Sequence, residues 1–170
     1  MRRRIGSVVT ITACLLVVSC SRRVDQHKFE SVYRAGKAIE GSLAVGVTYM
    51  KFTELVQSFA TEVSVAKDKA ANPAERQLVE LYGEALTGCT DSLTVWKLKI
   101  ENPRDTRIDV SDNADVRGII DTYAIQDGDP HAYSNLEPSG AMHLIWARVG
   151  AKLAAANRLY NGESASTAGQ

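Results

Sequence analysis

The signatures of most enzyme active sites are missing from this sequence of 170 residues. There is no GxSxG nucleophile elbow, no phosphate-binding loop, no GxGxxG fingerprint and no HExxH metal motif. The three histidines, His27, His131 and His143, are scattered along the chain, and no two cysteines have the spacing of a metal site. We therefore predict that the protein is not an enzyme and holds no cofactor or metal ion.

Long basic stretches are missing as well. The chain has 20 basic and 20 acidic residues, and no run of lysine or arginine follows Arg22 and Arg23. Because attraction to phosphate groups supplies much of the affinity for nucleic acids, the sequence predicts no nucleic-acid partner. We expect Arg22 and Arg23 to lie near anionic lipid headgroups instead.

An acid-rich segment between Asp105 and Asp121 invites comparison with a calcium site. The alternating oxygen ligands of an EF-hand loop are matched by Asp109, Ser111, Asn113 and Asp115. However, Ala114 stands where the loop turns on a glycine, and Ile120 stands where a bidentate glutamate is required. Helix capping and solvation explain these acids better than metal binding does.

The first 19 residues have the pattern of an export signal. Three arginines at positions 2–4 precede an uncharged and mostly apolar stretch over residues 5–18. A membrane-spanning helix needs about 20 apolar residues, whereas this stretch ends at Val18 and is followed by Ser19, Cys20 and Ser21. The pattern therefore predicts a signal peptide that is removed from the mature chain.

Residues 17–20, Val-Val-Ser-Cys, resemble the lipobox of bacterial lipoproteins. The resemblance implies cleavage before Cys20, a diacylglycerol on its sulfur, a signal peptide over 1–19 and a lipidated tether over 20–24. In bacteria with two membranes, an aspartate after the lipidated cysteine favours the inner membrane. Here that residue is Ser21, which implies the outer membrane, on its periplasmic face. The alternatives are an ordinary cleaved signal and an uncleaved anchor with an incidental cysteine.

Cysteine is too scarce for a disulfide framework. If Cys14 leaves with the signal and Cys20 carries lipid, only Cys89 remains in the folded part. Cys89 occupies an apolar helical position, so we interpret it as a small buried side chain. A reactive pair of Cys89 with His143 would require their two helices to touch at that point.

Apolar or small residues recur every three or four positions from Phe29 onward, which is a heptad seam. The seam comprises Phe29, Val32, Gly36, Ile39, Leu43, Gly46, Met50 and Thr53. After Thr53 it resumes out of register at Val56, Phe59, Val63, Ala66 and Ala70. We predict one long helix over residues 25–70 with a local change of winding, and a kink near Gly41 or Gly46 is left open.

The segment 72–75, Asn-Pro-Ala-Glu, predicts a tight turn and the start of a second long helix. Asn72 can cap it, Pro73 suits its first turn, and Glu75 can reach back to the amide of the cap. The second seam comprises Val79, Tyr82, Leu86, Cys89, Leu93, Trp96 and Ile100, and it ends before Pro103. Two seams joined by a short turn predict a long antiparallel hairpin.

Two more helices complete the predicted fold. A short helix capped by Ser111 or Asp112 carries Val116, Ile119, Ile120 and Tyr123, and a last helix extends over 139–160. The segment 126–139 between them is rich in turn residues. The sequence thus predicts an all-α fold, an irregular four-helix bundle in a single domain over 25–162, followed by a polar tail over 163–170.

These observations predict a lipid-anchored envelope lipoprotein that acts as a scaffold or interaction protein, with an unidentified envelope protein as partner. The candidate interaction loop mixes aromatic and hydrogen-bonding groups at His131, Tyr133, Asn135 and Leu136. The alternative is a small-ligand carrier or sensor whose pocket lies between the bundle helices. Such a pocket would be lined by Gly36, Gly46, Trp96 and Trp146.

Overall fold

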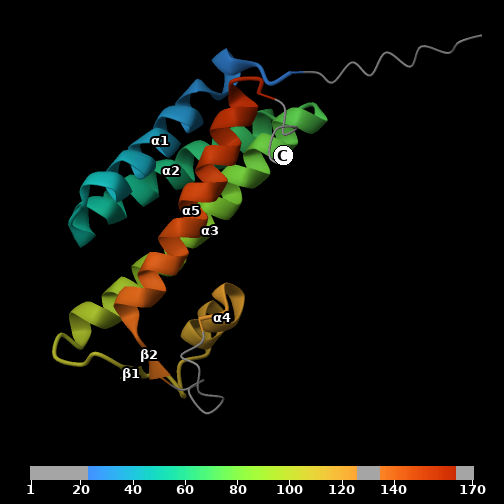
Figure 1. Ribbon diagram of the computed structural model, residues 1–170. Helices are drawn as coiled ribbons and strands as arrows, with labels where there is room; N and C mark the ends of the chain where they lie inside the picture. The colour runs from blue at the N-terminus through green and yellow to red at the C-terminus, as the bar shows by residue number, and fades with distance from the viewer. Residues whose placement is uncertain (1–22, 126–134, 164–170) are drawn as a thin grey trace, which may run out of the picture.

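The computed structural model describes residues 23–125 and 135–163, and most of them are helical (Figure 1). The helices are α1 (Gln26–Val45), α2 (Tyr49–Lys69), α3 (Pro73–Glu101), α4 (Ala114–Tyr123) and α5 (Pro138–Tyr160). Two strands of two residues each, β1 (Ile108–Asp109) and β2 (Asn135–Leu136), form the only sheet within these residues. The all-α prediction is therefore confirmed.

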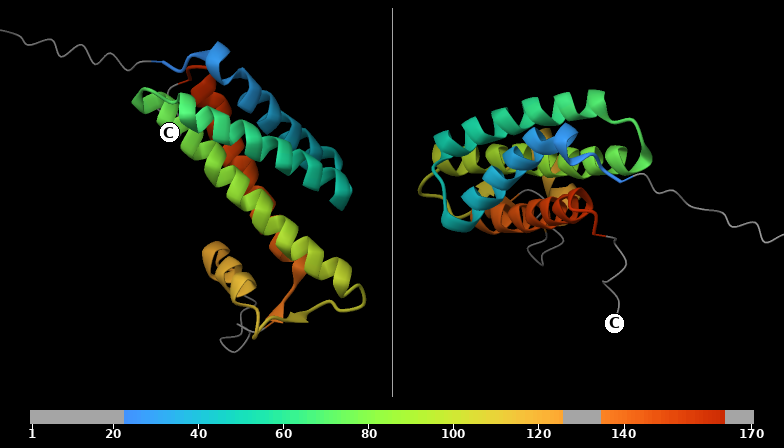
Figure 2. Two further views of the ribbon diagram at one scale, coloured as in Figure 1. Left: turned by 180° about the vertical axis from the view of Figure 1, so that it is seen from behind. Right: turned by 90° about the horizontal axis from the view of Figure 1, so that it is seen from above.

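Four of the helices form a closed ring around a common core. Helix α1 contacts α2 and α5, α2 contacts α3, and α3 makes its most extensive contact with α5. Figure 2 shows α4 beside the α3–α5 pair rather than within the ring. The four members of the bundle are therefore α1, α2, α3 and α5, whereas the sequence predicted a single helix over 25–70 and counted the short helix, α4, among the four.

The prediction of one continuous helix over residues 25–70 is wrong. The chain reverses between α1 and α2, where Gly46 has φ 84° and ψ 148°, a backbone conformation that disfavours residues with a side chain. Thr48 then caps α2 by accepting a hydrogen bond from the Lys51 amide at 3.3 Å. The change of register in the seam thus reflects two separate helices that pack side by side. Met50, which was assigned to the seam, is exposed.

The predicted hairpin turn at residues 70–73 is present and joins α2 to α3. The Asn72 side chain accepts a hydrogen bond from the Glu75 amide at 3.0 Å. The carboxylate of Glu75 does not bond the amide of the cap as expected, but accepts from the amide of Ala71 at 2.8 Å. It also pairs with Lys28 of α1 at 2.8 Å. This pair links the start of α1 to the start of α3.

Helices α3 and α5 approach each other closely at Gly88. A Cβ atom added to Gly88 would lie 2.5 Å from Cγ2 of Val149, a distance too short for two carbon atoms. The fully buried side chain of Ile145 lies next to this contact, 3.8 Å from the same position. Glycine at position 88 therefore sets the distance between the two central helices.

Helix α4 begins later than the sequence suggested. Its cap is Asn113, whose side chain accepts from the Val116 amide at 3.1 Å, rather than Ser111 or Asp112. The apolar face of α4 is buried as predicted, at Val116, Ile119, Ile120 and Tyr123. The antiparallel ladder pairs Ile108 with Leu136 and Asp109 with Asn135, which ties the segment before α4 to the segment before α5.

The two ends of the molecule are built from different elements (Figure 1). One end, here called the tether end, contains the start of α1, the α2–α3 turn and the end of α5 (residues 23–28, 66–76 and 158–163). Two hydrogen bonds join α1 to α5 there, from Gln26 Nε2 to the Tyr160 carbonyl at 3.0 Å and from the Tyr160 hydroxyl to the Gln26 carbonyl at 3.1 Å. The ladder lies at the opposite end, and α4 lies beside the α3–α5 pair near it. None of the described helices is long and apolar enough to cross a membrane.

The Lys28–Glu75 pair makes a testable contribution to stability that depends on pH. The Glu75 side chain is 4% exposed and the Lys28 side chain 26%. Burial alone would raise the pKa of Glu75, but the hydrogen bonds from Lys28 and from the Ala71 amide outweigh it and hold the pKa below its usual range. The carboxylate therefore stabilises the fold at pH values above the pKa of an unfolded glutamate, about 4.3. That contribution is lost as pH falls through the lower folded pKa.

We expect Glu75→Gln to lower the free energy of unfolding at pH 7 by about 1–2 kcal/mol, measured by denaturant unfolding. The difference from the wild-type protein should shrink steadily as the pH is lowered below about 4.3. Glu54→Gln is the matched control, because Glu54 forms an exposed pair with Lys51 at 2.9 Å and should change stability little. A Glu75→Gln effect that stayed constant with pH would contradict this account.

Candidate functional site

The residues predicted to carry function are divided between described and undescribed parts of the chain. Cys20, His131 and Tyr133 lie outside the described residues. Asn135 and Leu136 form β2, where Asn135 is exposed and Leu136 is fully buried. Leu136 therefore packs in the core instead of offering a contact surface. Of the two described residues of the candidate interaction loop, only Asn135 is available to a partner.

Two of the residues that match the calcium-binding loop, Asp109 and Asn113, have structural roles. Asp109 accepts a hydrogen bond from the Ser111 amide at 2.9 Å, and this bond lowers the pKa of Asp109. Asn113 caps α4, as described above. Among the described residues, no three His, Cys, Asp or Glu side chains are grouped closely enough to hold a metal ion.

Cys89 and His143 do not form a reactive pair. Helices α3 and α5 touch, as such a pair would require, but the Cys89 thiol is buried and His143 is exposed. Burial raises the pKa of Cys89 to about 12, so the thiol is protonated at neutral pH. Cys89 is a packing residue.

The four residues proposed to line a ligand pocket do not enclose one, because the space beside them is filled by side chains or lies open to solvent. The ring of Tyr82 occupies the space beside Gly36, since a Cβ atom there would lie 3.0 Å from the ring. Gly46 is exposed in the α1–α2 turn. Trp96 and Trp146 pack edge to face with ring centres 5.7 Å apart. The two indoles fill space between helices α3 and α5 instead of enclosing a cavity.

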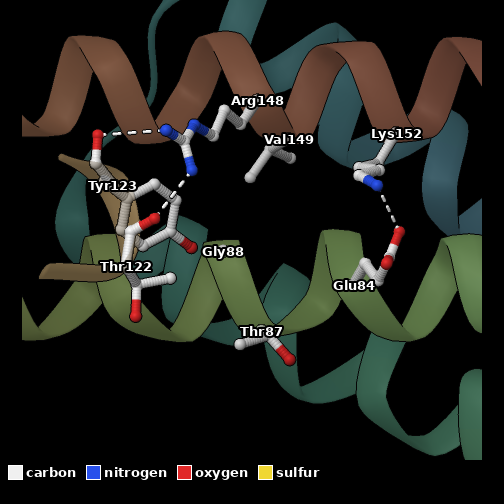
Figure 3. Close-up of a pocket in the computed structure, with 8 residues that line it drawn as sticks. All are labelled: Glu84, Thr87, Gly88, Thr122, Tyr123, Arg148, Val149 and Lys152. Atoms are coloured by element: carbon white, nitrogen blue, oxygen red, sulfur yellow. Dashed lines mark hydrogen bonds and ion pairs between the residues drawn. The ribbon is translucent and has the colours of Figure 1, made fainter. Parts of the chain in front are cut away.

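A cleft of about 290 Å³ lies where α3, α4 and α5 meet (Figure 3). Its walls come from three helices, and the lining residues are Glu84, Thr87, Gly88, Thr122, Tyr123, Arg148, Val149 and Lys152. The cleft lies beside the close contact of Gly88 with Val149, since both residues line it. This is the site at which α4 is attached to the bundle.

Arg148 of α5 holds the end of α4. Its guanidinium donates hydrogen bonds to the carbonyls of Thr122 at 2.8 Å and Tyr123 at 3.1 Å, and Figure 3 shows both. It also lies over the Tyr123 ring, 5.1 Å from its centre. The carbonyls at a helix C-terminus have no partner within the helix and carry partial negative charge. A cation at this position therefore stabilises the last turn of α4, where Ala124 adopts the left-handed conformation.

The hydroxyl of Tyr123 makes the second attachment. It donates a hydrogen bond to the carboxylate of Asp91 on α3 at 2.8 Å. Burial, and then this bond to a carboxylate, raise the pKa of Tyr123 above its usual range. The phenol is therefore protonated throughout the physiological pH range and acts as a donor.

The remaining polar groups of the cleft are also engaged. Lys152 of α5 pairs with Glu84 of α3 at 2.6 Å. The Thr87 and Thr122 hydroxyls donate to the carbonyls of residues four positions earlier, at 3.1 and 2.7 Å. With its charges paired and its hydroxyls bonded, this cleft serves to dock α4.

Sequence reasoning placed Tyr123 on the buried face of α4 but missed its partners. Asp91 and Arg148 stand 32 and 25 positions away from Tyr123 in the chain, so no local sequence pattern links either of them to it. The tyrosine within an apolar face was the available signal, since a buried hydroxyl requires a partner.

Comparisons with known proteins give no relative of this chain. No family model, no curated protein and no solved structure matches it.

Tyr123→Phe should loosen α4 without unfolding the bundle. The substitution removes the hydrogen bond to Asp91 and should cost about 1 kcal/mol. Amide hydrogen exchange should become about fivefold faster along α4 than in the wild-type protein, with little change in α2. Tyr33→Phe is the matched control, because the Tyr33 ring stacks on Tyr160 and its hydroxyl has no hydrogen-bond partner among the described residues. Equal exchange rates in the two variants would refute the proposed attachment.

Proposed function

We propose that this chain is a lipid-anchored protein of the bacterial envelope that holds another envelope component and catalyses no reaction. The export signal and the lipobox-like sequence at residues 17–20 motivate the anchor. Three acyl chains on one amino terminus would make it effectively permanent, since a single chain binds membranes only marginally. Ser21 after the cysteine favours the outer membrane, facing the periplasm.

The short distance between Cys20 and the first helix is the main support for this proposal. Gln26, the first residue of α1, follows Cys20 by six residues, so at most about 20 Å of chain separates the lipid from the bundle. The tether end would then lie against the bilayer. The ladder and the end of α3 lie at the opposite end (Figure 1), where they would project into the periplasm.

The projecting part of the molecule is acidic. Its described residues, 91–125 and 135–137, include eight acidic and five basic side chains. Most of the acids are exposed, among them Asp105, Asp109, Asp112, Asp115 and Asp121. We infer a protein partner with a basic surface, because opposite charges at an interface speed association and favour the correct partner.

The alternative of a small-ligand carrier has weaker support. Ligand sites generally enclose about 300–1,000 Å³. The α4 cleft, at about 290 Å³, lies at the lower limit with its polar groups already engaged. A groove of about 570 Å³ between α2 and α3 lies within that range, but it is open on the outside of the bundle. The residues first considered for a pocket do not enclose one.

The anchor is tested by the intact mass of the protein made in a bacterium that processes lipoproteins. The wild-type mass should equal residues 20–170 plus a diacylglycerol and one further acyl chain, and the protein should fractionate with membranes. Cys20→Ala should abolish the modification and release the protein from membranes. Cys14→Ala is the control and should change neither result. An unmodified wild-type protein would overturn the anchor.

The partner is tested by photo-crosslinking in living cells. A Cβ atom added to Gly118 of α4 would meet no neighbouring group within 4 Å, so a larger residue fits there. A photoreactive residue at this position should yield a discrete adduct with an envelope protein that has a basic surface. The same residue at Ser64 of α2, which is exposed near the tether end, should not yield that adduct. Identical adducts at both positions, or no adduct at Gly118, would count against a partner on this part of the molecule.

A further inference from the structure

A second hollow lies on the outside of the bundle between α2 and α3, at the tether end. This groove, of about 570 Å³, is lined by Val63, Lys67, Ala70, Arg76, Val79, Glu80 and Gly83. Its floor is apolar, since Val63 and Val79 are packed into it, whereas Lys67 and Arg76 are exposed at its rim. The groove thus combines an apolar floor with two cations and one acid, Glu80.

The groove is close to the point where the tether enters the bundle. The Lys28–Glu75 pair brings the first turn of α1 against the first turn of α3 at 2.8 Å. Arg76, at the rim of the groove, is the next residue after Glu75. A lipid on Cys20 would therefore keep the groove close to the phospholipid headgroups.

The charge of the tether end is opposite to that of the projecting part. Residues 23–28, 66–76 and 158–163 contain six basic and four acidic side chains, a net charge of +2, whereas the projecting part is acidic. Lys28 is already paired with Glu75. Lys67, Lys69 and Arg158 form no ion pair with any described residue, so their charges remain open to an anion outside the protein. A dipole of this sign favours one orientation on an anionic surface.

We propose that the α2–α3 groove and the basic residues around it bind the headgroups of an anionic phospholipid bilayer. This proposal rests on the proposed function, which places the tether end at a membrane. Arg76 donates one hydrogen bond to the Ala71 carbonyl at 3.0 Å and keeps further donors for a phosphate. Lys67 supplies a second charge from across the groove. The apolar floor accommodates the glycerol and the first methylenes of the lipid.

The test uses the mature chain, residues 20–170 with Cys20→Ser, which contains every described residue and lacks the lipid. Its binding to vesicles of phosphatidylglycerol and of phosphatidylcholine is measured by co-sedimentation. A Lys or Arg near an anionic surface strengthens binding by about fivefold. Lys67→Gln together with Arg76→Gln should therefore weaken binding to the anionic vesicles by about 25-fold. Lys97→Gln together with Arg117→Gln removes the same charge from the projecting part and should change binding by less than about twofold.

Each result decides the proposal. Binding to phosphatidylglycerol that 0.5 M salt abolishes and that only the groove variant loses supports it. Equal binding to both lipids, no binding to either, or equal losses in the two double variants would overturn it, the last because net charge alone would then govern binding. Circular dichroism of each variant verifies folding. The lipid-free chain separates this outcome from the anchor, which the mass of the Cys20 variants tests independently.

Discussion

The contact between α3 and α5 at Gly88 is the constraint on which the rest of the structure depends. Because position 88 has no side chain, Val149 packs directly on the α3 backbone, and two helices of 29 and 23 residues lie together along their length. Helices α1 and α2 then cover one side of this pair and α4 covers another. The groove at α2 and the cleft at α4 both follow from how these additional helices rest on a fixed central pair.

The two sides of the central pair are held by different forces. Helix α2 contributes large apolar side chains such as Phe52 and Phe59, which are fully buried. Helix α4 is short, and its end is fixed by directional polar contacts, from Arg148 to its last carbonyls and from Tyr123 to Asp91. The free energy gained by burying apolar surface is roughly proportional to the area buried. A helix of ten residues therefore gains less stability from burial than a long helix does. The polar attachment compensates for the small apolar face of α4.

The sequence predicted those features that depend on near neighbours in the chain. The cap at Asn72, the buried face of α4 and the core positions Phe29 and Val32 all follow from spacing over a few residues. Gly46 was ambiguous, because a glycine on a seam suits both close helix packing and a chain reversal. The contact of α1 with α2 decides between them, and the cap at Thr48 was the local sign of the reversal. Arg148 was beyond prediction, since its partners are carbonyls at the end of another helix.

The bonds at the start of α1 also determine how the protein responds to mechanical force. A pull on the amino terminus acts first on Gln26 and Lys28, which are bonded to the end of α5 and the start of α3 respectively. The stacked rings of Tyr33 and Tyr160, with centres 4.2 Å apart, add a third link one turn further on. These contacts must slide past one another together before α1 detaches. Tension on the amino terminus is therefore shared among three helices, α1, α3 and α5.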